Sequence, residues 1–247
     1  MIVFIHGLLQ VPTPHVVAAS LPAGETLAPD LPGYGTHVDA RDVSLDAAVN
    51  QVARVIRAAG APAHVAGHSV GGAAAMLLAY RHPELVRSVI SIEGNFMPAD
   101  AFWSRSIAGQ SETEVEHWLA EQRRDPARWL AAQGIVATPE RVVRTAEGLA
   151  AQPATSIRAM ARSVVRHTFA PEYLQMVQQI ISRGTPIHLI AGERSVAGWD
   201  VPSWVRDAAA SERLVPGVGH LVWLEDAHAA GAAVVAAAAL TDARATA

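Results

Sequence analysis

The chain has 247 residues, of which 51% are hydrophobic and 17% are charged, and its formal net charge is −4. This composition fits one large, well-buried domain or a domain with a sizeable insertion, and it excludes a disordered chain. The small negative charge, with no basic block, excludes an electrostatic site for nucleic acid or an anionic membrane. Cysteine is absent, which excludes disulfides, thiolate metal sites and cysteine nucleophiles.

Neither end of the sequence has the pattern of a targeting or membrane segment. The opening residues MIVFIHGLLQ are apolar but lack a basic leader. The longest apolar tract, AAGAAVVAAAAL, is alanine-rich and shorter than the roughly 20 residues that span a bilayer. We therefore expect a cytoplasmic protein with no membrane or nucleic-acid partner, and the sequence carries no signal for a particular oligomeric state.

The first part of the chain alternates short apolar strands with helices. We expect strands at 2–5, 25–28, 63–69 and 86–94. Between them we expect a helix that Ser44 caps and Gly60 ends, and an alanine-rich helix that Pro83 stops. This strand–helix rhythm predicts an α/β fold, a mostly parallel sheet with helices on both faces.

The rhythm breaks after residue 95. Residues 96–184 contain helix-like segments and no convincing strand, at 100–108, 113–123, 126–132, 139–150, 155–166 and 171–182. Strands are expected again at 186–192 and 213–217, with helices at 202–209 and 224–240. The sequence therefore predicts an α/β core of residues 1–95 and 185–247 that carries a helical lid, residues 96–184.

Ser69 is the candidate nucleophile because it is the serine of the G-x-S-x-G pattern GHSVG. An apolar strand enters this pattern and an alanine-rich helix leaves it, which is the context of a strained strand-to-helix turn. Gly67 and Gly71 relieve crowding there. The turn would expose the Ser69 hydroxyl beside a helix N-terminus, where negative charge is favoured.

Together with this turn, three further motifs make the chain resemble the α/β-hydrolase superfamily over nearly its whole length. They are HG at 6–7, DLPGYG at 30–35 and VPGVGH at 215–220. The resemblance implies a sheet of eight strands or slightly fewer, in which strand 2–5 matches the family's third strand. It also implies that the lid follows the family's sixth strand.

The resemblance assigns His220 as the base, because it ends VPGVGH after a strand and a glycine-rich turn. It makes His6 a structural residue that supports the oxyanion loop. A serine hydroxyl needs such a base, and acyl transfer also needs donors to the oxyanion. In this fold one donor is the backbone N–H of Val70, and the loop after strand 2–5 supplies another, most simply that of Leu8.

The acid of the triad is not where the family usually has it, because the loop IAGERSVAGWD has no aspartate directly after its glycine. Three carboxylates compete: Glu193 and Asp200 in that loop, and Glu93 at the end of strand 86–94. We favour Glu93, because a buried carboxylate is costly without a partner. Some dehalogenases and the zearalenone-type lactone hydrolases, which the chain resembles here, place their acid at this point. The structural alternative is that Glu93 holds the lid entrance through Asn95 or Arg105.

The lid is the most aromatic part of the chain. Most of its aromatic residues are expected to form the lid core. Those nearest the strand ends and catalytic loops are predicted to line an apolar substrate pocket: Phe96, Met97, Trp103, Trp199 and Leu221.

These residues predict a serine hydrolase that cleaves a carboxylic ester or lactone of a largely apolar small molecule. The same groups would also suit a C–C bond hydrolase, a thioesterase or a perhydrolase, and a hydrolase-like ligand receptor is the non-enzymatic alternative. No metal and no organic cofactor is expected, because the sequence has no metal-ligand spacing and the serine machinery is complete.

Overall fold

The computed structural model describes residues 1–11 and 13–245, and its centre is a six-stranded sheet. The strands are ordered β2-β1-β3-β4-β5-β6, and every neighbouring pair is parallel. The strands are β1 (Ile2–Ile5), β2 (Thr26–Leu27), β3 (Ala63–His68), β4 (Val86–Ile92), β5 (Ile187–Gly192) and β6 (Ser211–Val215). In a parallel sheet all carboxyl ends meet at one edge, so the loops after the strands can build a common site.

Successive side chains of the inner strands enter two separate hydrophobic cores. Val3 and Ile5 of β1 belong to one core, and Ile2 and Phe4 belong to the other. This alternation buries both faces of the sheet, as parallel sheets require.

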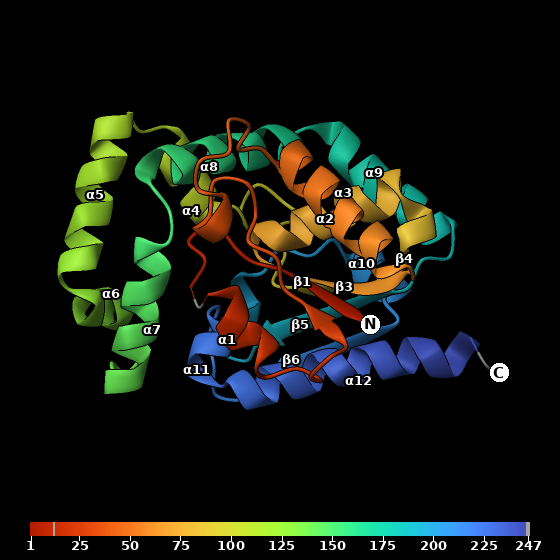
Figure 1. Ribbon diagram of the computed structural model, residues 1–247. Coiled ribbons are helices and arrows are strands. Elements are labelled where there is room, and N and C mark those ends of the chain that lie inside the picture. Colours follow the sequence, from red (N-terminus) through yellow and green to blue (C-terminus); the bar gives the residue numbers. More distant parts are fainter. Residues whose placement is uncertain (12, 246–247) are drawn as a thin grey trace.

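Helices cover the two faces (Figure 1). On one face α2 (Leu45–Ala59) and α3 (Val70–Arg81) pack together, and α10 (Ser203–Ala208) adds Val205 to the same core. On the other face lie α1 (Pro14–Ala18) and α12 (Ala227–Ala245), with α11 (Val222–Glu225) directly before α12. The predicted α/β architecture is confirmed.

The helix signals in the first part of the chain act as expected. The Ser44 hydroxyl accepts a hydrogen bond from the Ala47 amide at 3.1 Å, which caps α2. Gly60 ends that helix with φ of 78°, a conformation that glycine adopts at low cost. Helix α3 ends at Arg81, before Pro83.

A helical insertion separates β4 from β5, where the rhythm of the sequence breaks. Helix α9 packs on α3, and α8 packs on α2 and α4, whereas α5, α6 and α7 lie to one side of the sheet (Figure 1). The lid boundaries at residues 96 and 184 stay a prediction. The six helices of the insertion are α4 (Phe102–Ala108), α5 (Glu112–Arg124), α6 (Pro126–Ala132), α7 (Pro139–Ala150), α8 (Ala154–Thr168) and α9 (Pro171–Ser182).

Two elements differ from the sequence-based expectation. The short helix α1 was not expected, and the single helix expected at 224–240 is divided at Asp226 into α11 and α12. The Asp226 carboxylate accepts a hydrogen bond from the Ala229 amide at 2.9 Å, so it caps the start of α12. None of the helices in the described part of the chain is long and apolar enough to cross a membrane.

Candidate active site

Ser69 stands at the sharp turn between β3 and α3. Its backbone has φ of 54° and ψ of −117°, an unfavourable conformation for a residue with a side chain. The Ser69 amide donates to the Ile92 carbonyl at 3.0 Å, which anchors the turn to β4. The Ser69 side chain is half-buried at the carboxyl edge of the sheet. The turn thus presents a hydroxyl at the edge where parallel-sheet sites assemble.

Two glycines make this turn possible. A Cβ at Gly67 would lie 2.1 Å from the Gly71 carbonyl oxygen, and a Cβ at Gly71 would lie 2.1 Å from the Ile5 carbonyl oxygen. Backbone atoms cannot move aside as the end of a side chain can. Any larger residue at either position would therefore displace the turn.

The loop after β1 lies directly beside Ser69. A Cβ at Gly7 would be 3.4 Å from the Ser69 Cβ. Among the described residues the Leu8 amide has no hydrogen-bond partner. Val70 is the first residue of α3, where a backbone N–H has no partner within the helix. Both amides predicted to stabilise an oxyanion thus belong to segments that border the serine.

The HG and DLPGYG motifs hold that loop in place. The His6 Nε2 accepts a hydrogen bond from the Leu31 amide at 3.1 Å, while its Nδ1 lies 2.9 Å from the Gly7 carbonyl oxygen. Burial lowers the pKa of His6 to about 4, so this histidine is neutral at pH 7. Gln10, with φ of 50°, donates to the Asp30 carboxylate at 2.5 Å.

Glu93, directly after β4, contacts His220, which lies in the loop after β6. The Glu93 Oε2 lies 2.8 Å from the His220 Nδ1, although the two residues are 127 positions apart in the sequence. Because the carboxylate accepts the proton on Nδ1, Nε2 is the nitrogen left to act as a base. Within the described part of the chain Nε2 is buried and has no hydrogen-bond partner.

The second oxygen of Glu93 is held by the end of β5 and the loop after it. The Oε1 accepts from the Gly192 amide at 2.8 Å and from the Ser195 hydroxyl at 2.5 Å. Burial raises the pKa of Glu93. The hydrogen bond and the charge of His220 lower it, as do the hydrogen bonds from Ser195 and Gly192, and together they hold the pKa below its usual value. Glu93 has φ of 42°, so its backbone is strained as well. The carboxylate is ionised and fixed in direction.

Residues 2–237 match the model of the alpha/beta hydrolase family. The chain belongs to that family. A protein of Gibberella zeae described as an AB hydrolase superfamily protein is 38% identical over 78 residues, which cover 31% of this chain and 28% of that protein.

Solved structures show the same fold at low sequence identity. MenH from S. aureus is 17% identical with a TM-score of 0.72, and the match covers 98% of this chain and 94% of that one. A thermophilic esterase from Thermogutta terrifontis is 15% identical with a TM-score of 0.68, covering 97% and 89%. The fold and the superfamily predicted from the sequence are thereby confirmed.

In this alpha/beta hydrolase the two competing carboxylates have other surroundings than Glu93. Glu193 and Asp200 are exposed, and the Glu193 carboxylate accepts from the Gly217 amide at 2.8 Å. The Asp200 amide donates to the Asp100 carboxylate at 2.7 Å. Among the described residues neither carboxylate is hydrogen-bonded to His220.

Asp100, which the sequence did not single out, holds the entrance to the insertion. Its carboxylate also accepts from the Phe96 amide at 3.0 Å and from the Met97 amide at 2.9 Å. Burial raises the pKa of Asp100 despite these bonds. Asp100 therefore holds the start of the insertion, which is the structural role that the sequence offered as an alternative for Glu93. The signal was present in the sequence, as an acidic residue at the start of a predicted helix.

The predicted pocket residues fall into different surroundings. Phe96 and Trp199 are buried with ring centroids 6.0 Å apart, and the Trp199 indole donates to the Gly94 carbonyl at 2.8 Å. Leu221 lines a cavity of about 10 Å³ beside His6 and His68, which is too small for a substrate. Trp103 and Met97 are half-buried. The ring of Trp103 lies against His220, and so does that of Phe102, which was expected only as part of the lid.

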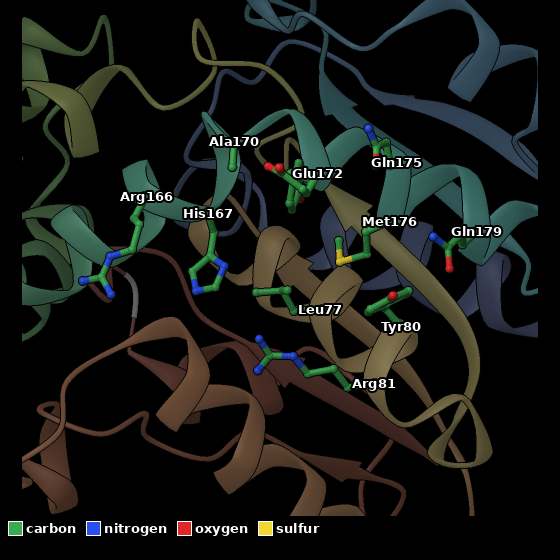
Figure 2. Close-up of a pocket in the computed structure, with 11 residues that line it drawn as sticks. Leu77, Tyr80, Arg81, Arg166, His167, Ala170, Glu172, Gln175, Met176 and Gln179 are labelled. Atoms are coloured by element: carbon green, nitrogen blue, oxygen red, sulfur yellow. The ribbon is translucent and has the colours of Figure 1, made fainter.

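A separate cavity of about 320 Å³ lies between α3 and α9 (Figure 2). None of Ser69, Glu93 and His220 lines it. Two of its side chains are engaged elsewhere, since Arg81 and His167 both contact the Asp46 carboxylate, at 2.6 and 3.0 Å. We therefore do not assign it to the hydrolase site.

Proposed function

We propose that this alpha/beta hydrolase cleaves carboxylic esters, including lactones, of largely apolar small molecules through an acyl-enzyme. The observation that carries the proposal is the 2.8 Å contact between Glu93 and His220, at the same sheet edge as the strained Ser69 turn. A buried, ionised glutamate directed at one imidazole nitrogen is the arrangement that leaves the other nitrogen free to take a proton.

In the proposed reaction Ser69 Oγ attacks the ester carbonyl carbon while its proton passes to the His220 Nε2. The Glu93 carboxylate keeps the other imidazole proton on Nδ1 and stabilises the imidazolium that forms. The negative charge on the carbonyl oxygen is accepted by the backbone N–H groups of Leu8 and Val70. The imidazolium then gives its proton to the alkoxide of the leaving alcohol as the C–O bond breaks.

Water completes the cycle. His220 takes a proton from a water molecule, the resulting hydroxide attacks the acyl carbon, and the proton returns to Ser69 Oγ as the acid leaves. Every step uses groups of this chain and water alone. We therefore expect full activity after dialysis against EDTA, and activity lost to the chelator and restored by a divalent ion would contradict the mechanism.

The surroundings of the site support an apolar substrate. Phe102 and Trp103 border it from the insertion, and their side chains are exposed and half-buried respectively. Met97 stays a predicted pocket residue. Apolar walls with a few fixed polar groups are typical of small-molecule sites. The solved structure from Thermogutta terrifontis is described as an esterase, which supports the ester as the bond that is cleaved.

A fluorophosphonate probe tests the proposal directly. We expect covalent labelling of the wild-type protein and none of Ser69→Ala, with both proteins melting at similar temperatures. Turnover of short p-nitrophenyl esters should follow the same pattern, and parallel panels of lactones, thioesters and diketones rank the bond types. A folded protein that is not labelled, or labelling that persists in Ser69→Ala, would overturn the proposal and favour a ligand receptor.

A further inference from the structure

Two neighbouring aromatic side chains of α4 lie edge-on against the base. The ring centroid of Phe102 is 5.7 Å from that of His220, with an interplanar angle of 65°, and that of Trp103 is 5.8 Å away at 82°. The two rings contact one another at 5.2 Å, and Trp103 contacts Trp129 at 6.0 Å. We call Phe102, Trp103 and Trp129 the aromatic wall.

The aromatic wall is graded from buried to exposed. Trp129 is 3% exposed and supports the wall from behind, Trp103 is half-buried, and Phe102 is 44% exposed. A large aromatic ring left open to water beside a catalytic histidine is apolar surface that a bound group could cover. The His220 ring also contacts His68, whose ring centroid is 4.8 Å away and whose Nε2 donates to the His220 carbonyl at 2.8 Å.

The chemistry of the proposed reaction decides which part of the substrate meets this wall. The leaving oxygen must approach within hydrogen-bond distance of the His220 Nε2 to receive its proton. The acyl group, in contrast, is bonded to Ser69, and its carbonyl oxygen faces Leu8 and Val70. The group attached to the leaving oxygen therefore lies close to the imidazole, and Phe102 and Trp103 are the aromatic side chains of the insertion that contact that ring.

We infer that the aromatic wall is the leaving-group site, and that the preferred substrates are esters of aryl or arylmethyl alcohols. An aromatic ring suits this site because it can meet the rings of Phe102 and Trp103 edge-to-face or offset-stacked. This inference rests on the proposed function, since it uses His220 as the proton donor. It adds which side of the ester the protein selects.

Two acetates with leaving groups of similar reactivity, benzyl acetate and n-propyl acetate, test the inference. In Phe102→Ala we expect kcat/KM for benzyl acetate to fall by about 10-fold or more, mainly through KM, and that for n-propyl acetate by less than about 3-fold. The ratio between n-propyl acetate and n-propyl butyrate, which differ only in the acyl chain, should stay as in the wild type. Phe169→Ala is the matched control, because Phe169 is a second exposed phenylalanine of the insertion, at 37%, and it should change none of these values.

The rate of fluorophosphonate labelling, in which fluoride leaves, is measured for every variant as the reference for Ser69 reactivity. If both acetates fall equally in Phe102→Ala, Phe102 supports His220 and the inference is wrong. A changed acetate-to-butyrate ratio would place the wall on the acyl side and also overturn it. Failure of the proposed function is a separate result, because the wild-type protein would then not be labelled.

Discussion

The carboxyl ends of β4 and β5 lie next to each other in the sheet, and both carry acidic residues. After β4, Glu93 is 5% exposed, has a strained backbone and contacts His220. After β5, Glu193 and Asp200 are exposed, and within the described part of the chain neither carboxylate is hydrogen-bonded to the histidine. Two hydrogen-bond donors to Glu93 come instead from this neighbour, the amide of Gly192 at the end of β5 and the hydroxyl of Ser195 in the loop after it.

In the proposed mechanism, the work of the triad acid is therefore divided between two strand ends. A buried carboxylate is stable only if its oxygens are satisfied, and β4 alone offers no donors for Glu93 Oε1. The loop after β5 needs no acid of its own once it holds the acid of β4. Ser195 therefore acts as a positioning residue in the proposed mechanism.

The largest effect is expected from Glu93→Gln. We predict that kcat falls by about 10²- to 10⁴-fold, because an amide can favour the wrong tautomer of His220. Glu93→Asp should fall between this variant and the wild type, since it keeps the charge but leaves a gap to the imidazole. Steady-state kinetics with an activated ester, together with thermal melts, measure the order of the three proteins. Near-full activity of a normally folded Glu93→Gln would remove Glu93 from the triad.

A second variant tests whether a carboxylate in the loop after β5 can replace that of Glu93. In Glu93→Ala with Ser195→Asp, the new carboxylate starts beside the volume that Glu93 leaves, because Ser195 Oγ is 2.5 Å from Glu93 Oε1. We predict that kcat recovers about 10-fold relative to Glu93→Ala alone, through restored contact with the imidazole. Glu93→Ala with Val196→Asp adds the same charge one residue later and should recover nothing. If neither double variant is more active than Glu93→Ala alone, the loop cannot carry the acid.

The sequence predicted the parts of the site that depend on local pattern. The turn at Ser69 follows from two glycines whose Cβ atoms would collide with backbone, and the strands around it follow from short apolar runs. The choice of Glu93 over Glu193 and Asp200 needed one further step, the cost of a carboxylate at the end of a buried strand. The structure places Glu93 against His220, and its catalytic role stays a prediction.

What the sequence could not predict depends on contacts between distant segments. The hydrogen bond from Ser195 to Glu93 joins residues 102 positions apart, and no local pattern marks Ser195 as a donor. Aromatic residues posed the same difficulty, because Phe96 and Phe102 both look apolar in a sequence. One is 1% exposed and packs on Trp199, whereas the other is 44% exposed beside His220.

A smaller effect is expected from Ser195→Ala. The Ser195 hydrogen bond is one of the interactions that lower the pKa of Glu93, so its loss raises that pKa and Glu93 takes up a proton at higher pH. We predict a kcat about 3- to 10-fold lower and an acid limb of the pH profile of kcat/KM displaced to higher pH. Ser195→Thr keeps the hydroxyl and should restore both. An unchanged acid limb in Ser195→Ala would mean that the hydroxyl does not act on the triad.

The smallest effects are expected from substitutions of the two acidic residues in the loop after β5, Glu193 and Asp200. We predict that Asp200→Asn and Glu193→Gln each change kcat by less than about 2-fold, as is usual for exposed substitutions. The bond from Asp200 to Asp100 uses the Asp200 backbone amide, so it survives the change to asparagine. A glutamine at 193 can still accept from the Gly217 amide, so the turn before His220 keeps its partner. The same assay and melts as for Glu93→Gln put all variants on one scale. An inactive but folded Asp200→Asn beside an active Glu93→Gln would reverse the comparison, because the acid would then lie at the end of β5.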